Sequence, residues 1–352
     1  MDLDLSALAD TLAAWEVAPT SLTYAPVGFG DHHWTARTAD GRRWFVTVAD
    51  LAHKPYCGAG VETAREGLRR AMDTAAALNA DAGLDFVVAP LRTAFFGASS
   101  MASSGATVRR LGDRYAVSVF PYLDASAGRF GREPPPEHRR LLVERLAVLH
   151  RTPAPAATPV HRPGLPDRAP LEAALREPLD AFAPDSGPYA ERCRALLTDS
   201  ARGLRHRLGE FDERTARLIR QAPTPVVTHG EPHPGNVLDP GGRNLLVDWD
   251  TVALAVPERD VWLCSPDPDD LARYEELTGH RPDRDRLAYY ALRWAFDDVA
   301  ACLDVFRALH AATPDTAQAW EGLTGAVAQL NVCGPMGFTE NLTTVAPWKK
   351  RH

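Results

Sequence analysis

The first third of this sequence has the patterns of β-strands and the rest has the patterns of helices. This order restricts the possible folds more than any other feature. From about Ser21 to Tyr122, short apolar, β-prone runs alternate with turn residues and surround one Ala-rich helical stretch at 61–80. The expected strands are Trp34–Arg37, Trp44–Val48, Phe86–Val88, Thr107–Arg110 and Tyr115–Phe120. Ala39-Asp40-Gly41 is typical of a hairpin turn between the first two strands.

Helical patterns dominate after Tyr122. Pro136–Arg151 carries leucines at helical spacing behind an N-terminal proline, and a long polar helix is expected at about Pro188–Arg220. Thr152–Pro170 is Pro-rich and predicts an irregular connector. A late amphipathic stripe, expected to pack in a core, comprises Ala295, Val299, Cys302, Leu303 and Phe306. The sequence therefore predicts an α+β fold in two lobes, residues 1–122 and 123–352.

Composition narrows the class of protein further. The 352 residues include 46 acidic and 39 basic ones, a net charge of −7, so we expect no nucleic-acid partner. The sequence shows no secretory signal and no run of ~18 apolar residues, which predicts a cytoplasmic protein without a membrane partner. Its five scattered cysteines lack CxxC spacing and are expected to be reduced. The sequence leaves the oligomeric state open.

Residues 226–250 hold the densest group of polar side chains that can carry chemistry. These are His229, Glu231, His233, Asn236, Asp248 and Asp250. Strands at Asn236–Leu238 and Leu245–Asp248 are expected to form a hairpin that brings Asn236 and Asp248 together at its open end. An amide oxygen beside a carboxylate suits Mg²⁺, and the carboxylate of Glu231 can face an attacking hydroxyl.

This segment has two other interpretations. His229 and His233 have the spacing of zinc ligands on a helix, but Pro232 and Pro234 exclude a regular helix and the HExxH order is absent. Alternatively the polar residues only cap turns, as Asn and Asp often do. The clustering of six such groups favours a functional site.

The segment resembles the catalytic and metal loops of the aminoglycoside phosphotransferase family, a branch of the protein-kinase-like fold. The family pattern, His-Gly-Asp-x4-Asn and then an apolar strand ending in Asp, corresponds here to His229-Gly-Glu-Pro-His-Pro-Gly-Asn236 and Leu245-Leu-Val-Asp248-Trp-Asp250. Pro257-Glu-Arg-Asp260 resembles the helix start that follows in the family, where Asp260 is expected to hold the catalytic loop. The match covers most of the chain in lobe order.

This resemblance implies a two-lobed kinase-like fold and transfer of the γ-phosphate of ATP or GTP to a substrate hydroxyl. It also implies that Asn236, Asp248 and Asp250 bind Mg²⁺, that Glu231 is the base facing the nucleophile, and that His229 supports the loop. Positioning and charge neutralisation supply most of the catalysis in such reactions.

Glu231 departs from the family pattern, which has Asp there. The extra methylene moves the carboxylate, and a misplacement of ~1 Å can cost ~10²-fold in rate. Either the pocket accommodates the longer side chain or the protein is a catalytically weak relative. Because both metal-ligand positions are intact, the first interpretation is favoured.

The missing lysine of the third strand is a second departure from the family pattern. Thr47 occupies the equivalent position of that strand here. Only Lys54, Lys349 and Lys350 are lysines, so Lys54 or an arginine is expected to bind phosphate, unless Lys54 is an exposed loop residue. Other candidate nucleotide-binding residues are Gly28, Gly30 and Asp31 of a Gly-rich loop, Glu66 (or Glu62) as partner of a phosphate-binding cation, and Pro121 and Tyr122 of the hinge.

The acceptor is expected among the helices of the second lobe. Acids that could meet a cationic antibiotic, or simply lie in solvent, are Asp267, Asp269, Asp270, Asp297 and Asp298. The leading hypothesis is an antibiotic kinase, for an aminoglycoside or nucleoside, that acts in resistance or self-protection. The alternatives are a nucleotide-binding pseudokinase that serves as a partner-binding module and a metal-dependent hydrolase. Fold analogy alone cannot choose the substrate.

Overall fold

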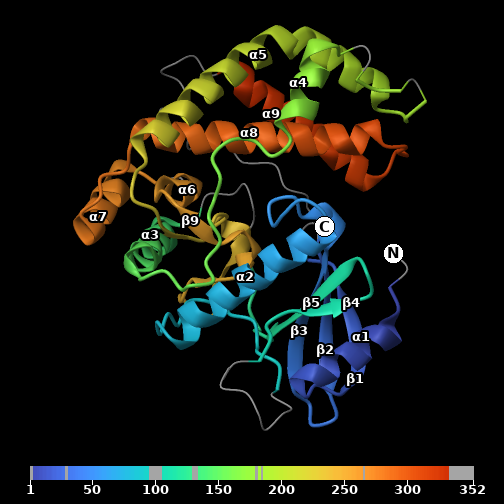
Figure 1. The fold of residues 1–352 in the computed structure, drawn as a ribbon, viewed down its shortest axis with the longest axis vertical. Helices are drawn as coiled ribbons and strands as arrows, with labels where there is room; N and C mark the ends of the chain where they lie inside the picture. Colours follow the sequence, from blue (N-terminus) through green and yellow to red (C-terminus); the bar gives the residue numbers. More distant parts are fainter. Residues whose placement is uncertain are drawn as a thin grey trace.

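The computed structural model describes residues 3–27, 31–94, 105–128, 134–178, 181–183, 185–264 and 266–332. The chain forms two lobes, one around a five-stranded antiparallel sheet and a larger one built mainly of helices, which confirms the predicted fold class (Figure 1). Gly28 and Gly30 of the expected Gly-rich loop, together with Lys349 and Lys350, lie outside the described residues.

The sheet of the first lobe has the strand order β1-β2-β3-β5-β4. Its strands are β1 (Pro19–Ala25), β2 (His32–Thr38), β3 (Arg43–Asp50), β4 (Arg109–Leu111) and β5 (Tyr115–Pro121). Gly41, at φ +83°, makes the predicted turn between β2 and β3, since glycine adopts this conformation without strain. The strand expected at Phe86–Val88 is wrong: Val87 makes a single bridge to Leu246, and Phe86 fills the core.

Helix α1 (Leu5–Leu12), which the sequence patterns did not reveal, covers one face of the sheet. Asp4 caps it by accepting hydrogen bonds from the amides of Ser6 (2.9 Å) and Ala7 (3.3 Å). Leu8 and Leu12 are buried against inward-facing side chains of the strands, such as Val46 of β3.

Helix α2 (Val61–Ala80) belongs to the main core of the protein and has the predicted boundaries. Gly67 lies within it for a packing reason, because a Cβ there would come within 1.9 Å of the carbonyl oxygen of Cys57. The segment between β3 and α2 therefore lies directly against the helix, and the same segment carries Lys54 to the site.

The helical lobe consists of layers packed around α8, whose long axis runs beneath α5 and α9 in Figure 1. The helices are α3 (Pro136–Arg151), α4 (Arg168–Arg176), α5 (Ala190–Gln221), α6 (Glu258–Val261), α7 (Pro268–Thr278), α8 (Arg284–Arg307) and α9 (Pro314–Val332). The predicted stripe of α8 is buried, as expected. No helix in the described part of the chain is long and apolar enough to cross a membrane.

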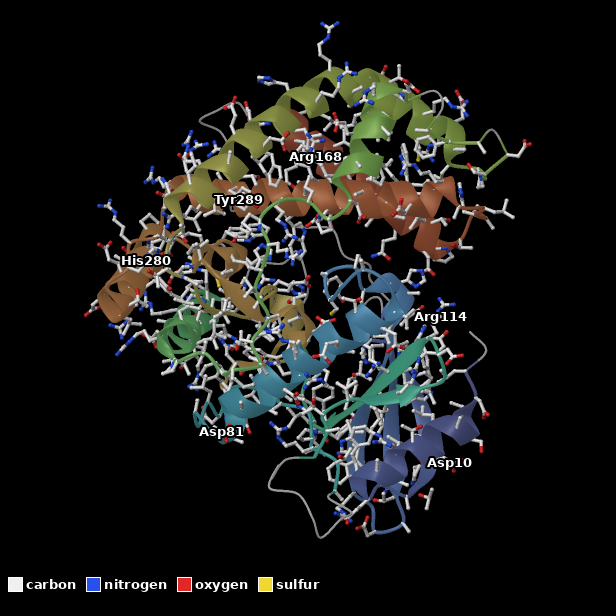
Figure 2. The ribbon with its side chains drawn as sticks, in the orientation of Figure 1. Asp10, Asp81, Arg114, Arg168, His280 and Tyr289 are labelled. Carbon is white, nitrogen blue, oxygen red and sulfur yellow. The ribbon has the colours of Figure 1, made fainter. Side chains whose placement is uncertain are left out.

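The connector between α3 and α4 is tied to α8 rather than loose. The amide of Gly164 donates to the hydroxyl of Tyr289 (2.8 Å), and its carbonyl accepts from Nε of Arg293 (2.9 Å). Tyr289 lies on α8, where Figure 2 labels it. The irregular connector that the prolines predict is thus held in place by hydrogen bonds between its backbone and two side chains of α8.

Two short strand pairs interrupt the helices and carry the site. β6 (Val226–Thr228) pairs with β9 (Ala253–Ala255), and β7 (Val237–Leu238) pairs with β8 (Leu245–Leu246). The predicted hairpin is therefore real but shorter than expected. Asn236 belongs to a 3₁₀ turn, and Asp248 has φ +65°, so neither fits an extended strand.

Candidate active site

The predicted catalytic loop (residues 229–236) begins where β6 ends and turns sharply at Gly230. Gly230 has φ +102°, and a Cβ there would lie 2.4 Å from Nη2 of Arg259. Both the backbone conformation and the close approach of the guanidinium require glycine. The turn lifts Glu231 out of the line of the strand.

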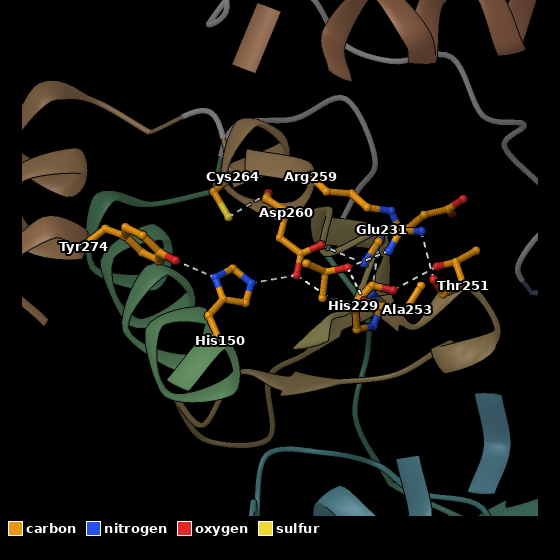
Figure 3. A network of polar contacts seen from close by, with 11 residues as sticks. His150, His229, Glu231, Thr251, Ala253, Arg259, Asp260, Cys264 and Tyr274 are labelled. Carbon is orange, nitrogen blue, oxygen red and sulfur yellow. Dashed lines mark hydrogen bonds and ion pairs between the residues drawn. The ribbon is translucent and has the colours of Figure 1, made fainter. Parts of the chain in front are cut away.

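Asp260 anchors the start of this loop, as the sequence predicts. Its two carboxylate oxygens accept from the amides of His229 and Gly230, each at 2.7 Å (Figure 3). Nε2 of His150 lies 3.1 Å from the same carboxylate, and Nδ1 of His150 lies 2.6 Å from the hydroxyl of Tyr274. Burial alone would raise the pKa of Asp260, but the hydrogen bond and charge of His150 and the charge of Arg259 lower it overall.

His150 and Tyr274 lie behind Asp260 as two buried members of the same network. They come from α3 and α7, and His150 lies 110 positions before Asp260 in the sequence. Sequence patterns do not reveal their role, because a single buried histidine at a helix end is not distinctive without the contacts.

His229 is a buried support of the loop, the role that the family resemblance implies. Its Nδ1 accepts from the amide of Glu231 (3.2 Å), so its Nε2 carries the proton and donates to the carbonyl of Val247 (2.9 Å). Burial lowers the pKa of His229, which keeps the ring neutral. The imidazole therefore links the catalytic loop to the strand that leads to Asp248.

Asn236 and Asp248 lie on either side of the hairpin that the sequence predicts. Nδ2 of Asn236 donates to the carbonyl of Glu231 (3.0 Å), and the carbonyl of Asn236 accepts from the amide of Val247 (3.0 Å). The surrounding protein, and then the negative charges of Asp250 and Glu231, raise the pKa of Asp248 well above its usual range. The three acidic groups therefore act on one another electrostatically.

Lys54 joins the first lobe to these carboxylates. Its Nζ lies 2.5 Å from Oδ2 of Asp250, 3.0 Å from Oδ2 of Asp31 and 2.9 Å from the hydroxyl of Tyr56. The side chain is 4% exposed, so the alternative of an exposed loop lysine is wrong. Burial opposes the charge of Lys54, but Asp250, Tyr56 and Asp31 outweigh it and raise its pKa.

The position of Lys54 follows from the way β3 ends. Asp50, the last residue of β3, accepts from the amide of Ala52 (3.3 Å) and from the guanidinium of Arg114 (2.6 and 2.7 Å). It thereby caps the 3₁₀ turn Leu51–His53, after which Lys54 points to the metal loop (residues 248–250). A lysine seven residues after Thr47 thus reaches the site through a turn, not from the strand.

The side chains of Asn236, Asp248 and Asp250 suit a Mg²⁺ ion that is also bound by phosphate. No three His, Cys, Asp or Glu side chains form a ready metal cluster within the described ranges. Two carboxylates and one amide leave up to half of an octahedral shell to phosphate and water, and Mg²⁺ usually keeps such ligands in nucleotide sites. Burial is the main reason for the raised pKa of Asp248, and the charges of Asp250 and Glu231 add to it, a repulsion that a bound cation would relieve.

Comparison with known protein families identifies the family of this chain. The model of a family described as "Phosphotransferase enzyme family" matches residues 21–301. The chain belongs to this phosphotransferase family. The match spans both lobes and includes Lys54, the catalytic loop and the metal loop.

Relatives of this phosphotransferase include one curated protein with substantial sequence identity. Protein StrN of Streptomyces griseus is 31% identical over 260 residues, which cover 70% of this chain and 73% of StrN. Among solved structures, spectinomycin phosphotransferase APH(9)-Ia with ADP and spectinomycin has a TM-score of 0.68 at 14% identity, covering 98% of this chain and 99% of that one.

Two more solved structures share the fold at lower similarity. Amicoumacin kinase hAmiN has a TM-score of 0.56 at 10% identity, covering 94% of this chain and 93% of its own. Choline kinase LicA from Streptococcus pneumoniae has a TM-score of 0.51 at 13% identity, covering 92% and 98%. At these identities the structures show the fold of the phosphotransferase alone.

The remaining first-lobe candidates are only partly brought together. Oγ1 of Thr47 lies 3.1 Å from Nδ1 of His33, whose pKa is lowered to about 4 by burial and then by the charge of Lys54. Asp31 is the first-lobe carboxylate that forms an ion pair with Lys54. Burial raises the pKa of Asp31 to about 6, although the charge of Lys54 opposes this shift. Sequence analysis placed Asp31 in the phosphate loop but did not pair it with Lys54.

Glu66 is not brought to the phosphate-binding cation. It is exposed on α2 and pairs with Arg69 (2.6 Å), while Glu62 pairs with Arg65 (2.7 Å) and Arg110 (2.6 Å). The two glutamates lie one turn apart on α2, but both are on the solvent-exposed face of the helix and neither pairs with Lys54.

The hinge candidates lie at the end of β5. Pro121 pairs with Trp44 of β3, and the ring of Tyr122 lies under the guanidinium of Arg43, whose Cζ is 4.1 Å from the ring centroid. This contact fixes Tyr122 beside the sheet at the point where the chain leaves the first lobe.

Two of the acids proposed to meet a cationic acceptor have structural partners instead. Asp267 and Asp270 form ion pairs with Arg139 and a reciprocal capping box at the start of α7. Asp297 lies 3.5 Å from Arg293. A cavity of about 560 Å³ beside α3 is lined by Pro234 of the catalytic loop and by Val237, but by none of the side chains predicted to act in the site.

Proposed function

We propose that the protein transfers the γ-phosphate of ATP or GTP to a hydroxyl group of a small-molecule antibiotic, of the aminoglycoside or nucleoside type. Such a reaction would inactivate the compound and serve resistance or self-protection. The observation that carries the proposal is the convergence of Lys54, Asp250 and Asp248 beside Glu231. A buried cation from one lobe and acidic groups from the other are the parts that phosphoryl transfer requires.

In this proposal the two lobes divide the work, with residues 1–122 binding the nucleotide and residues 123–352 holding the metal, the base and the acceptor. Lys54 would contact the phosphates by exchanging a carboxylate for a phosphate oxygen, both of which accept charge-assisted hydrogen bonds. The backbone at Pro121 and Tyr122 would receive the base of the nucleotide.

Asn236, Asp248 and Asp250 would hold Mg²⁺, which neutralises charge on the phosphates when it is bound. Glu231 would accept the proton of the acceptor hydroxyl. The loop supports this role because Asp260, His229 and Asn236 all bind its backbone and hold the longer side chain in a defined place.

The relatives support an antibiotic over other acceptors. The structure with the highest TM-score quoted above is named for spectinomycin and another is named for amicoumacin. Choline kinase has the same fold, so a metabolite is the competing acceptor class. The rival function is a pseudokinase, motivated by Glu231 in place of the family Asp.

The test is a mass-spectrometric screen of antibiotics, with spectinomycin, an aminoglycoside and a nucleoside antibiotic, in Mg²⁺ with ATP or GTP. We expect one compound to gain a phosphate in a nucleotide-dependent reaction, and the Glu231→Gln variant to serve as the inactive control. Nucleotide binding without any product would favour the pseudokinase, and turnover without nucleotide would favour a hydrolase.

A further inference from the structure

Arg259 is a buried arginine that lies beneath the catalytic loop and that the proposed reaction does not yet use. It belongs to α6 and is 7% exposed. Its Nη1 donates to Oγ1 of Thr228 (2.8 Å), and its Nη2 donates to the carbonyl of Thr251 (2.8 Å), as Figure 3 shows for Thr251. One guanidinium therefore bridges the residue just before the catalytic loop and the residue just after the metal loop.

The two residues bound by Arg259 are also connected to the loops directly. Oγ1 of Thr251 donates to the carbonyl of His229 (3.0 Å), and Oγ1 of Thr228 donates to the carbonyl of Ala253 (2.8 Å). Because each hydroxyl donates to the other segment, the guanidinium closes a ring of hydrogen bonds across the pair β6 and β9. A shift of either loop would break at least one bond of this ring.

Gly230 provides independent evidence that the guanidinium supports the loop. An added Cβ at Gly230 would meet Nη2, Cζ and Nη1 of Arg259 at 2.4 to 2.7 Å. The guanidinium thus fills the space where a side chain would stand and touches the backbone one residue before Glu231.

The charge of Arg259 has the sign that suits this place. Burial lowers its pKa, opposed by Asp260 and Glu231 among others, and an arginine remains charged under such conditions. A buried cation is costly unless anions compensate it, and here the charge of Asp260, with a smaller contribution from Glu231, offsets part of that cost.

We propose that Arg259 is a positioning residue, which fixes the catalytic loop with Glu231 relative to the metal loop with Asp248 and Asp250. This inference rests on the proposed phosphotransfer for its kinetic part. It explains how a glutamate can serve where the family has aspartate, because the longer side chain starts from a fixed backbone.

Hydrogen exchange tests the positioning without any acceptor. Arg259→Met should speed exchange by about tenfold or more in peptides that cover 226–232 and 249–254, in both together, since local opening follows lost contacts. Arg207→Met is the matched control, because Arg207 is equally buried but lies on α5 and binds Glu210 and the carbonyl of Leu330. Unchanged exchange in the two peptides would overturn the proposal.

Kinetics with the acceptor from the screen test the consequence for catalysis. Arg259→Ala should lower kcat by about thirtyfold or more while the nucleotide KM changes by less than about threefold. Guanidinium at about 20 mM should restore part of kcat saturably, whereas urea, a neutral molecule of similar shape, should not. If Arg259→Ala instead binds less nucleotide per mole of protein, and guanidinium does not restore kcat, then Arg259 has only a structural role.

Two outcomes keep this inference separate from the proposed function. If the wild-type protein transfers no phosphate, the proposed function fails but the exchange experiment still decides the link between the loops. If Arg259→Met does not fold, Arg259→Lys replaces it, because it keeps the charge but cannot donate in the same fork to both acceptors. Wild-type exchange in Arg259→Lys would contradict the bridging role.

Discussion

The ammonium group of Lys54 lies 2.5 Å from Oδ2 of Asp250, a contact between residues 196 positions apart that joins the end of β3 to the metal loop. The same ammonium also binds Asp31 and Tyr56, so all three of its protons have acceptors. Phosphate or Mg²⁺ can enter this group only by exchange with a contact that is already made. Binding of the two ligands should therefore depend on Lys54 in opposite ways.

Replacing Lys54 by methionine should weaken nucleotide binding. The variant loses one charge-assisted contact to phosphate, so we expect the nucleotide KM to rise, or kcat to fall, by about tenfold or more. Arg65→Met is a suitable control, since Arg65 lies on α2 and pairs with Glu62. Steady-state kinetics with varied ATP and GTP measure the effect, and an unchanged nucleotide dependence would remove Lys54 from the site.

The same variant should bind Mg²⁺ more tightly in the absence of nucleotide. Lys54→Met removes the cation from Asp250 and leaves its charge, with that of Asp31, to be neutralised by metal. Because a ligand of the native state stabilises it in proportion to RT ln(1 + [L]/Kd), the rise in Tm on adding Mg²⁺ should exceed that of the wild-type protein. A smaller rise in the variant than in the wild type would contradict competition between Lys54 and Mg²⁺.

Glu231→Gln should remove most of the transfer activity while nucleotide binding persists. The amide cannot accept the proton, and a positioned base is typically worth about 10²- to 10⁴-fold in rate. Glu231→Asp is the informative second variant, because it keeps the carboxylate and restores the residue of the family pattern. Near-wild-type kcat in Glu231→Gln, measured by product formation, would end the assignment of this residue as the base.

Local sequence signals predicted the elements whose boundaries are set locally. The proline at N1 fixes the start of α3, and Gly41 with its positive φ fixes the turn between β2 and β3. The strand expected at Phe86–Val88 failed because an apolar run can be buried without pairing, and here Val87 makes only one bridge. Periodicity therefore identified buried segments more reliably than it identified their conformation.

The candidate site was predicted in type but not in its contacts. The spacing of Glu231, Asn236 and Asp248 follows from one continuous segment and a family pattern, so the sequence contains it. Lys54 with Asp31, and Arg259 beneath Gly230, depend on packing between distant segments. The scarcity of lysine is a usable sequence signal for the contact of Lys54 with Asp31. The glycine that precedes Glu231 is only a weak signal for the position of Arg259.

Asp260→Asn should destabilise the protein and remove part of its sensitivity to acid. Asp260 has a lowered pKa in the folded state, so its contribution is present above the unfolded pKa of about 3.9 and is lost as the pH falls through the folded value. At pH 7 the neutral amide leaves His150 and Arg259 without their buried anion, and the free energy of unfolding should fall by about 3–5 kcal/mol.

Urea unfolding at pH 7 and at pH 4 measures this effect of Asp260→Asn. The difference between variant and wild type should be nearly the same at both values. It should shrink only below the unfolded pKa, where the unfolded wild-type chain takes up a proton, until the native carboxylate is protonated as well at its lower pKa. Asp285→Asn is the control, since Asp285 is half-exposed, binds Arg214 and Arg217, and should cost only about 0–1 kcal/mol. Equal losses in the two variants would mean that Asp260 does not anchor the catalytic loop.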